Sequence, residues 1–377
     1  MNASGRIAAG LVLCALVLGA GRIEACSVPV FRYALERWPP APYELYVFHR
    51  GPLEGDARKV ADWISTCAAG IDVVSNVESL LVDLDGKPDA AVLDLWGKQT
   101  QATLPWMVLK YPGFYQFPGQ VWSGPLTAAN AKALLDSPAR REIGKRILSG
   151  HTAVWVLLEG GDRARDDAAA GLVGAELLKM KAALKVSELL PEDLMEGMEE
   201  DAPDVKVDFS LLRLSRKDPA ERVLVEMLLG SEAGLRGSDE PIVFPVFGQG
   251  RALCSLVGKG ISTENLNDIG QFLVGPCSCI VKDQNPGIDL LMSADWTALP
   301  EGRWVKPPEL PPLTGIPDLA PKTTTPQRDS GPVGWRWLSW GQHGSLGRGV
   351  LAVGVLALVV VLVATVLIKR RRRSEET

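Results

Sequence analysis

The sequence predicts an α/β protein with two repeated units and one membrane-spanning helix near the C-terminus. Segments with the alternating pattern of strands are followed by segments with helical periodicity, and this series occurs twice. Pro105 and Thr127 lie twenty-two positions apart, and so do Pro241 and Thr263. Gly349–Ile368 is a run of twenty residues without a charged side chain. The matched spacing predicts an internal repeat, and a twenty-residue apolar helix rises about 30 Å, enough to cross a bilayer.

The first unit is expected over residues 43–150. Pro88 is well placed for the first turn of a helix, and Thr127 is a favourable N-cap for another. The expected strands are Tyr43–His49, Ile71–Val77, Trp106–Tyr111 and one near Val121. The expected helices are Asp56–Ala68, one that follows Pro88, Ala128–Leu135 and one that ends near Gly150.

The second unit is expected over residues 151–299. Asp218, Pro219 and Glu221 form a cap, a helix-starting proline and a supporting acid for a helix to Leu229. The expected strands are Ala153–Leu158, Val205–Leu214, Ile242–Phe247 and Ala252–Val257, with a turn at Gly248–Gly250. The other expected helices are Arg163–Val186 and one capped by Thr263 that runs to Phe272.

This order of strands and helices resembles the thioredoxin-like fold over Tyr43–Cys279. In that family a proline, commonly cis, precedes the third strand, and Pro105 and Pro241 occupy the matching positions. The family's redox CxxC lies between the first strand and the first helix. Here the corresponding loops, residues 49–54 and 159–163, contain no cysteine. The resemblance therefore implies two tandem degenerate copies, each a mixed sheet flanked by helices, without the family's oxidoreductase activity at these loops.

The N-terminus has the features of a secretory signal peptide over residues 1–25. Arg6 provides a positive charge, Ile7–Ala20 is apolar, and cleavage is expected near Ala25. Cleavage there would leave Cys26 first, at the start of an N-terminal arm over residues 26–42. Acylation of Cys26, as in a lipoprotein, is an alternative.

The C-terminal part predicts a stalk, a span and a tail. Nine prolines lie between Pro300 and Pro332, so residues 300–348 have the composition of an extended stalk. Gly349–Ile368 is the predicted contact with the lipid bilayer, and residues 369–377 form a basic tail on the cytoplasmic side. These features predict a single-pass protein of the cytoplasmic membrane whose N-terminal domains are extracytoplasmic.

Charge and histidine content exclude several classes of function. The net charge is −5 at pH 7, which argues against a nucleic-acid partner. The chain has three histidines, so a multi-histidine metal centre is not expected, and no cofactor is predicted. Residues 191–204 carry seven acidic side chains and no basic ones, a pattern of a solvated loop, or of weak cation binding without EF-hand spacing. His49, directly after the first strand, is a solvent-facing loop residue or part of a site.

Five cysteines would remain after signal cleavage: Cys26, Cys67, Cys254, Cys277 and Cys279. All five are disulfide candidates, and their odd number leaves at least one thiol unpaired, lipidated or shared with a partner. Cys67 lies on the apolar face of its helix and is expected to be buried. Cys277 and Cys279 form the concentrated motif. A structural disulfide is the favoured role, either between these two cysteines or from one of them to Cys26, Cys67 or Cys254. Redox chemistry and metal ligation by the two thiolates are the alternatives.

Together these patterns predict a tethered binding or assembly module of a bacterial-type cell envelope, built from redox-inactive domains, with a protein partner in the envelope. The alternative is an envelope thiol–disulfide oxidoreductase that uses Cys277 and Cys279, with Cys26 or Cys254 as the resolving partner. No set of residues supports a hydrolase.

Overall fold

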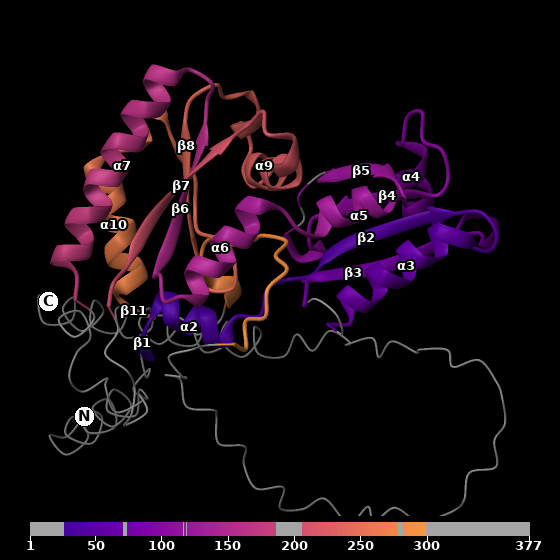
Figure 1. The fold of residues 1–377 in the computed structure, drawn as a ribbon, viewed down its shortest axis with the longest axis horizontal. Helices are drawn as coiled ribbons and strands as arrows, with labels where there is room; N and C mark the ends of the chain where they lie inside the picture. The colour runs from indigo at the N-terminus through magenta and orange to yellow at the C-terminus, as the bar shows by residue number, and fades with distance from the viewer. Residues whose placement is uncertain are drawn as a thin grey trace, which may run out of the picture. The chain divides into compact units, whose positions relative to one another are not determined.

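Two mixed β-sheets, each flanked by helices, make up the part of the chain described by the computed structural model (Figure 1). The description covers residues 26–70, 74–115, 117, 119–185, 206–277 and 282–298. All of them lie within one compact part of the chain, Met1–Glu309, which contains both repeated units. At this level the predicted fold class is confirmed, since the chain is α/β with two mixed sheets.

The first sheet has the strand order β3-β2-β4-β5. Its strands are β2 (Tyr43–His49), β3 (Val77–Asp83), β4 (Trp106–Lys110) and β5 (Trp122–Pro125). The helices that accompany it are α3 (Gly55–Ala68), α4 (Ala90–Gly97), α5 (Ala128–Leu135) and α6 (Pro138–Leu148), with short 3₁₀ turns at Leu84–Gly86 and Gly113–Tyr115.

The second sheet has the order β12-β9-β8-β6-β7, and β10 also pairs with β8. Its strands are β6 (Ala153–Glu159), β7 (Phe209–Ser215), β8 (Ile242–Phe247), β9 (Arg251–Ala252), β10 (Leu256–Val257) and β12 (Ile288–Asp289). Its helices are α7 (Arg163–Ala183), α9 (Arg222–Leu229) and α10 (Thr263–Val274). Short 3₁₀ turns lie at Pro219–Glu221, Leu235–Gly237, Gly258–Gly260 and Lys282–Gln284.

The two sheets share one pattern of strand directions. In the first sheet β2 and β3 are parallel, β4 is antiparallel to β2, and β5 is antiparallel to β4. In the second sheet β6 and β7 are parallel, β8 is antiparallel to β6, and β9 and β10 are antiparallel to β8. The repeat that the proline spacing predicts is therefore present in the order and direction of the strands.

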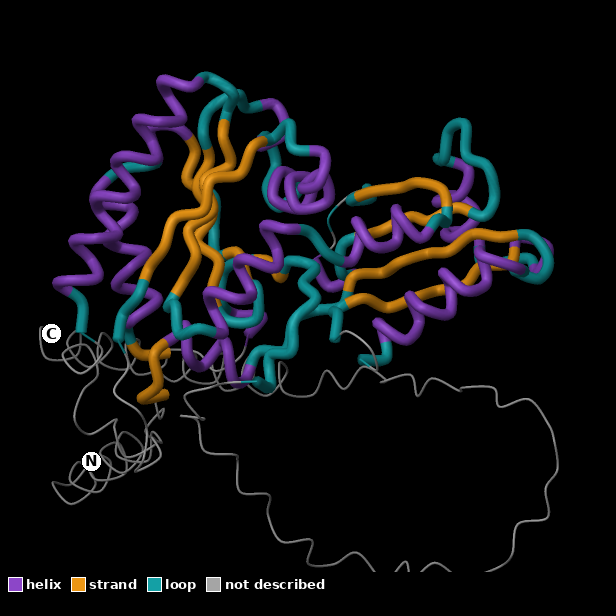
Figure 2. Tube along the Cα trace, viewed as in Figure 1, coloured by secondary structure: helices purple, strands orange, loops and turns teal. Residues whose placement is uncertain are grey.

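Three hydrophobic clusters hold these layers together. The largest cluster lies between the two sheets and includes side chains from α3, α5, α6 and α9. A second cluster lies between the second sheet and helices α2, α7 and α10, and Figure 2 shows α7 and α10 along that sheet. The third, on the opposite face of the first sheet, contains three buried residues, Phe48, Val82 and Val108, beneath α4. The core is therefore thick around the second sheet and thin on one face of the first.

The N-terminal arm packs on the second sheet. Strand β1 (Cys26–Pro29) pairs antiparallel with β11 (Pro276–Cys277), and helix α2 (Val30–Arg37) follows at once. Phe31, Ala34 and Trp38 are each at most 5% exposed within the second cluster. The apolar face of α2 packs against side chains of β8 and α10, which holds this segment on the second sheet.

Several local predictions are confirmed and several are wrong. The strands Tyr43–His49 and Ile242–Phe247 and the helix Ala128–Leu135 have the predicted bounds. The strand predicted at Ile71–Val77 is wrong, because the strand that pairs with β2 begins at Val77 and ends at Asp83. Ser262, not Thr263, caps α10, and its hydroxyl accepts the N–H of Asn265. α3 begins at Gly55, and Asp56 does not cap it.

The signal peptide, the acidic segment 191–204, the stalk, the span and the basic tail lie outside the described residues. None of the helices in the described part of the chain is both long and apolar enough to cross a membrane.

Candidate functional site

A segment near the end of the described chain, residues 282–298, joins the edges of both sheets; we call it the clasp segment. Its strand β12 pairs with β9, with Ile288 opposite Ala252. Further along, Ser293 forms an isolated bridge with Ser75, just before β3 of the first sheet. The three residues Leu290–Met292 between these pairings are at most 1% exposed. The clasp segment therefore satisfies its backbone groups on both sheets and buries its apolar side chains between them.

Asn76 connects the clasp segment to the first sheet and the N-terminal arm. Its side-chain amide donates to the carbonyls of Ala41 and Leu290, both at 3.0 Å. Its side-chain oxygen accepts the N–H of Met292 at 2.8 Å. One side chain thus satisfies one backbone group of the arm and two of the clasp segment, which stabilises the place where they meet the first sheet.

Asp289 is a buried carboxylate at the same junction, and it is 2% exposed. Its Oδ1 accepts from Arg251 Nη1 at 3.1 Å. Its Oδ2 accepts from the N–H of Ala41 at 2.9 Å and from the Tyr115 hydroxyl at 2.8 Å, and Lys282 pairs with it as well. Burial, with the Asp289 charge close by, raises the pKa of Tyr115, so this hydroxyl stays a donor. A buried charge with this many partners is a structural tie between the arm and both sheets.

Arg140 and Glu221 form a second buried polar cluster. Arg140, 1% exposed, donates to the carbonyls of Leu134, at the end of α5, and Leu291, in the clasp segment. Burial lowers the pKa of Arg140 to about 10, so at neutral pH it remains a cation. Glu221 accepts the Ser137 hydroxyl at 2.6 Å, at the start of α6. Buried charges therefore stabilise the end of α5 and the start of α6. Arg140 belongs to the first unit, and Glu221 belongs to the second.

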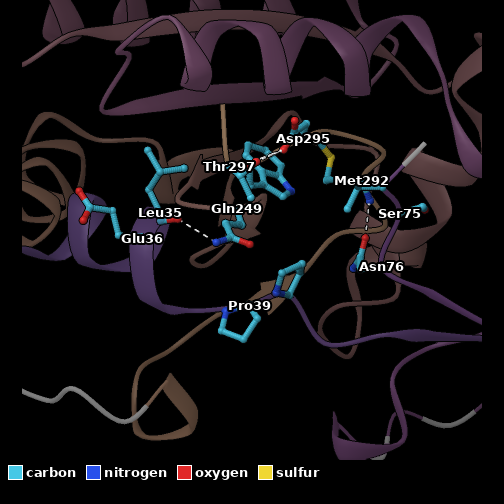
Figure 3. Close-up of a pocket in the computed structure, with 12 residues that line it drawn as sticks. Leu35, Glu36, Pro39, Ser75, Asn76, Gln249, Met292, Asp295 and Thr297 are labelled. Carbon is cyan, nitrogen blue, oxygen red and sulfur yellow. Dashed lines mark hydrogen bonds between the residues drawn. The ribbon is translucent and has the colours of Figure 1, made fainter. Parts of the chain in front are cut away.

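A cavity of 350 Å³ opens beside the clasp segment (Figure 3). Its walls come from helix α2, the following prolines, the residues just before β3, the turn after β8 and the clasp segment, and all but the prolines contribute polar groups. The lining residues are Leu35, Glu36, Pro39, Pro40, Val74, Ser75, Asn76, Gln249, Met292, Asp295, Trp296 and Thr297. The lining includes two carboxylates and no basic residue. Its size is near the lower end of small-molecule sites, which span about 300 to 1,000 Å³.

Two polar side chains at this cavity, Gln249 and Ser75, differ in their hydrogen bonding. Gln249 donates from Nε2 to the carbonyl of Leu35 at 2.8 Å, as Figure 3 shows. The buried Oγ of Ser75 has no hydrogen-bond partner within the part of the chain that the structure describes. A buried hydroxyl without a partner costs free energy, so a ligand or water that bonded to it would be favoured.

The loop after β2 is where the thioredoxin-like resemblance would place a redox pair. β2 and β3 end side by side, with His49 opposite Asp83. Asp83 Oδ1 accepts the N–H of Gly51 at 3.1 Å and that of Asp85 at 3.0 Å. These backbone hydrogen bonds, that from Asp85 first, hold the pKa of Asp83 below its ordinary value. His49 Nδ1 lies 2.7 Å from the Gly51 carbonyl. The loop is therefore closed by its own polar groups, and it contains no cysteine.

The loop after β6 is closed in a similar way. Asp166, 3% exposed, accepts the N–H of Gly160 at 2.7 Å and that of Gly161 at 3.0 Å. Asp162 caps α7 and accepts the N–H groups of Ala164 and Arg165. The N-terminus of a helix favours negative charge. At α7 the carboxylates of Asp162 and Asp166 already accept the N–H groups that a thiolate or an anionic ligand would need.

The cations around the second loop are also paired. Arg213 contacts Glu159 at 2.7 Å and Asp167 at 2.8 Å. Arg216 donates to the backbone carbonyls of Glu159 and Glu240. The hollow of 510 Å³ next to this loop therefore contains arginines whose donors are already engaged.

The structure separates the candidate cysteines. Cys67 is 1% exposed in the core, as predicted, and its sulfur is a thiol. Cys254 is a half-buried thiol next to the second cluster, and burial raises its pKa to about 11. Cys26 and Cys277 lie on the paired strands β1 and β11, and Cys279 lies outside the described residues. Among the residues that the structure describes, no two cysteine sulfurs are at disulfide distance.

The position of Cys277 relative to Pro241 bears on the redox alternative, which would be favoured if Cys277 and Cys279 were exposed near this proline. The N–H of Gly258, just before α10, donates to the Pro241 carbonyl at 2.9 Å. Cys277 follows the other end of α10, whose twelve residues rise about 18 Å. Cys277 and Pro241 are therefore at opposite ends of the second sheet, because the length of α10 separates them.

The two fold-marking prolines have equivalent positions. The carbonyl of Pro105 accepts the N–H of Leu126, just before α5. The carbonyl of Pro241 accepts that of Gly258, just before α10. The Leu104–Pro105 peptide bond is cis, and it is the one cis bond within the described ranges, so the Glu240–Pro241 bond is trans.

Sequence reasoning missed the buried charges Arg251, Asp289 and Arg140. It gave Glu221 a local role in a helix cap, whereas this carboxylate accepts from Ser137 and Ala139 of the first unit. A local signal exists for one of the missed charges, since Asp289 is the single charge in the apolar run Ile288–Met292. For the others, the partners are far away in the chain, and no local pattern marks them.

Within the described part of the chain, no group of three or more histidine, cysteine or acidic side chains is placed to hold a metal ion. No protein-family model matches this chain, and no curated protein matches its sequence.

Proposed function

We propose that this protein is a membrane-tethered, extracytoplasmic binding or assembly module built from two redox-inactive thioredoxin-like domains. The shared strand order and directions of the two sheets support the fold assignment, as do the equivalent bonds of Pro105 and Pro241. The signal-like N-terminus, the apolar run Gly349–Ile368 and the basic tail support the tether and its orientation.

One observation carries the redox-inactive part of the proposal. Both loops at which this fold would hold a redox pair lack cysteine. In both, an aspartate carboxylate, Asp83 or Asp166, accepts the backbone N–H groups of the loop. A domain without a nucleophile at this position keeps the shape of the fold and is available for binding.

The cavity beside the clasp segment supports a binding role. It is lined by the arm, by the start of β3 and by the clasp segment, so an occupant would contact parts of both units. Apolar walls with a few polar groups are typical of small-ligand and peptide sites. We propose a protein partner in the envelope and no cofactor.

The test is an insulin-reduction assay with the purified full-length protein in a mild detergent and a dithiol reductant. We expect insulin to precipitate at the rate of the reductant alone, because neither loop supplies a thiolate. Thioredoxin in the same detergent is the positive control. A thioredoxin-like rate that survives replacement of both Cys277 and Cys279 by serine would contradict the proposal for the loops.

The second candidate, an oxidoreductase that uses Cys277 and Cys279, receives less support. Cys277 lies in a strand pairing at the far end of α10 from Pro241, whereas the resemblance places redox chemistry beside that proline. The assay above distinguishes this candidate, since its rate would be lost in the double serine variant.

A further inference from the structure

Strands β1 and β11 bring together two cysteines that are 251 positions apart in the chain. The strands are antiparallel, and Cys26 pairs with Cys277, with a shift of register between this pair and the pair Pro29–Pro276. Next to this pairing, the N–H of Val30 donates to the carbonyl of Gly275 at 3.0 Å. The start of the arm and the end of α10 are therefore held side by side by backbone pairing.

The backbone at this position suits a covalent cross-link. Residues directly opposite in an antiparallel pair have Cα atoms about 4.5 to 5.5 Å apart. Disulfides join residues whose Cα atoms are about 4.4 to 6.8 Å apart. The pairing of Cys26 with Cys277 carries this argument.

The positions of the other cysteines bear on which residue could pair with Cys26. Cys67 is a thiol inside the cluster between the sheets, and Cys254 is a thiol beside the second cluster. Neither cysteine lies on a strand that pairs with β1, whereas Cys277 does, so the strand pairing selects Cys277 among the described cysteines.

We propose that Cys26 and Cys277 form a disulfide in the exported protein. Two thiols lose two protons and two electrons as the Sγ–Sγ bond forms, and the acceptor is the disulfide of an exported dithiol oxidase, which leaves as a dithiol. The bond closes a loop that contains both sheets and ties the first residue of the processed chain to the end of α10.

This assignment has two consequences for the remaining chemistry. It occupies Cys26, so lipidation of that sulfur is excluded. It leaves Cys67, Cys254 and Cys279 outside the bond; of these, Cys279 is two positions from Cys277 in the sequence and is the expected thiol for attack on the disulfide by exchange. The assignment rests on the proposed export of the chain, because disulfides persist in oxidising compartments.

The test is peptide mapping of the full-length protein, expressed with its own signal sequence in a bacterial host that has an oxidising periplasm. Free thiols are alkylated at lysis, and the protein is digested without reductant. Cys277→Ser and Cys279→Ser are the matched variants, since they differ by two positions. We expect the Cys26 peptide to be cross-linked in the wild type and in Cys279→Ser, and released in Cys277→Ser.

The other outcomes overturn the assignment in distinguishable ways. A cross-link that survives Cys277→Ser but not Cys279→Ser gives the bond to Cys279. A diacylglyceryl thioether on Cys26 shows that the sulfur carries lipid. A chain that begins at Cys26 with both thiols alkylated overturns the disulfide and leaves the proposed function standing. A chain that still begins at Met1 with both thiols alkylated overturns the disulfide and the proposed export together.

Discussion

Helices α4 and α9 have the same place in the order of their sheets, yet one is exposed and the other is buried. Each has eight residues, and each follows the second strand of its sheet. No residue of α4 is buried. The buried residues of α9 are Val223, Leu224, Val225, Met227, Leu228 and Leu229.

The difference comes from what covers each helix. The Tyr111 hydroxyl of the first unit donates to the Glu226 carbonyl of α9 at 2.8 Å. The N–H of Leu291, in the clasp segment, lies 3.3 Å from the sulfur of Met227. α4 covers its sheet alone, and Leu93 on it is 44% exposed. Equivalent helices in a repeat are therefore buried according to their tertiary neighbours, and α9 belongs to the junction between the units.

The largest expected loss of stability follows from breaking the buried ion pair Arg251–Asp289, which joins strand β9 to the clasp segment. Arg251→Met should lower the free energy of unfolding by about 3 to 5 kcal/mol, because it removes one of the two cations that pair with buried Asp289 and two hydrogen bonds to backbone carbonyls. Urea denaturation of the full-length protein in detergent, followed by tryptophan fluorescence, measures this.

The matched control for that variant is Arg58→Met, at an exposed pair with Asp62. Exposed ion pairs contribute little, so this variant should unfold close to the wild type. Arg251→Met combined with Asp289→Leu should recover part of the loss. If Arg251→Met is no less stable than Arg58→Met, the buried pair is not what holds the clasp segment.

A pair of leucine variants compares the two helices directly. Leu228, on α9, is fully buried, and Leu228→Ala should cost about 2 to 5 kcal/mol of stability. Leu93→Ala on α4 should change stability by about 0.5 kcal/mol or less, since that side chain is largely exposed. Both are measured by the same denaturation curves. Equal losses would contradict the difference in burial between α4 and α9.

The smallest expected effect is at alkaline pH and concerns the Tyr111 contact with α9. Burial raises the pKa of Tyr111 to about 12, from an ordinary value near 10. The unfolded chain therefore loses this proton first, and the stability from Tyr111 is present below pH 10 and is lost as the pH rises to about 12. The two-unit difference corresponds to roughly 2 to 3 kcal/mol.

Comparison with Tyr111→Phe isolates this contribution. The lowered pKa of Arg140, about 10, acts in the opposite direction over the same pH range, but it is present in both proteins. We expect the free energy of unfolding of the wild type to fall more steeply than that of Tyr111→Phe between pH 10 and pH 12. Parallel pH profiles would show that the hydroxyl titrates normally in the folded state.

Prediction from sequence succeeded where the signal is local. The strand Ile242–Phe247 follows a proline and is continuously apolar, and its bounds were predicted to the residue. The prediction of the second strand failed, because the segment that pairs with β2 is the following one, Val77–Asp83, and the pairing depends on a partner about thirty positions away. The turn Gly248–Gly250 was predicted, but its contribution of Gln249 to the cavity was not.

The sequence by itself determined the succession of strands and helices, caps such as Thr127 and Asp218, and the absence of cysteine from the two loops. These follow from hydrogen bonds and side-chain periodicity within a few residues of each other. Only the tertiary structure decided that α9 is buried and α4 exposed, that Asp289 meets Arg251, and that Cys26 is opposite Cys277. Burial and register are decided by partners tens to hundreds of positions away, and a local pattern contains no information about which distant segment supplies them.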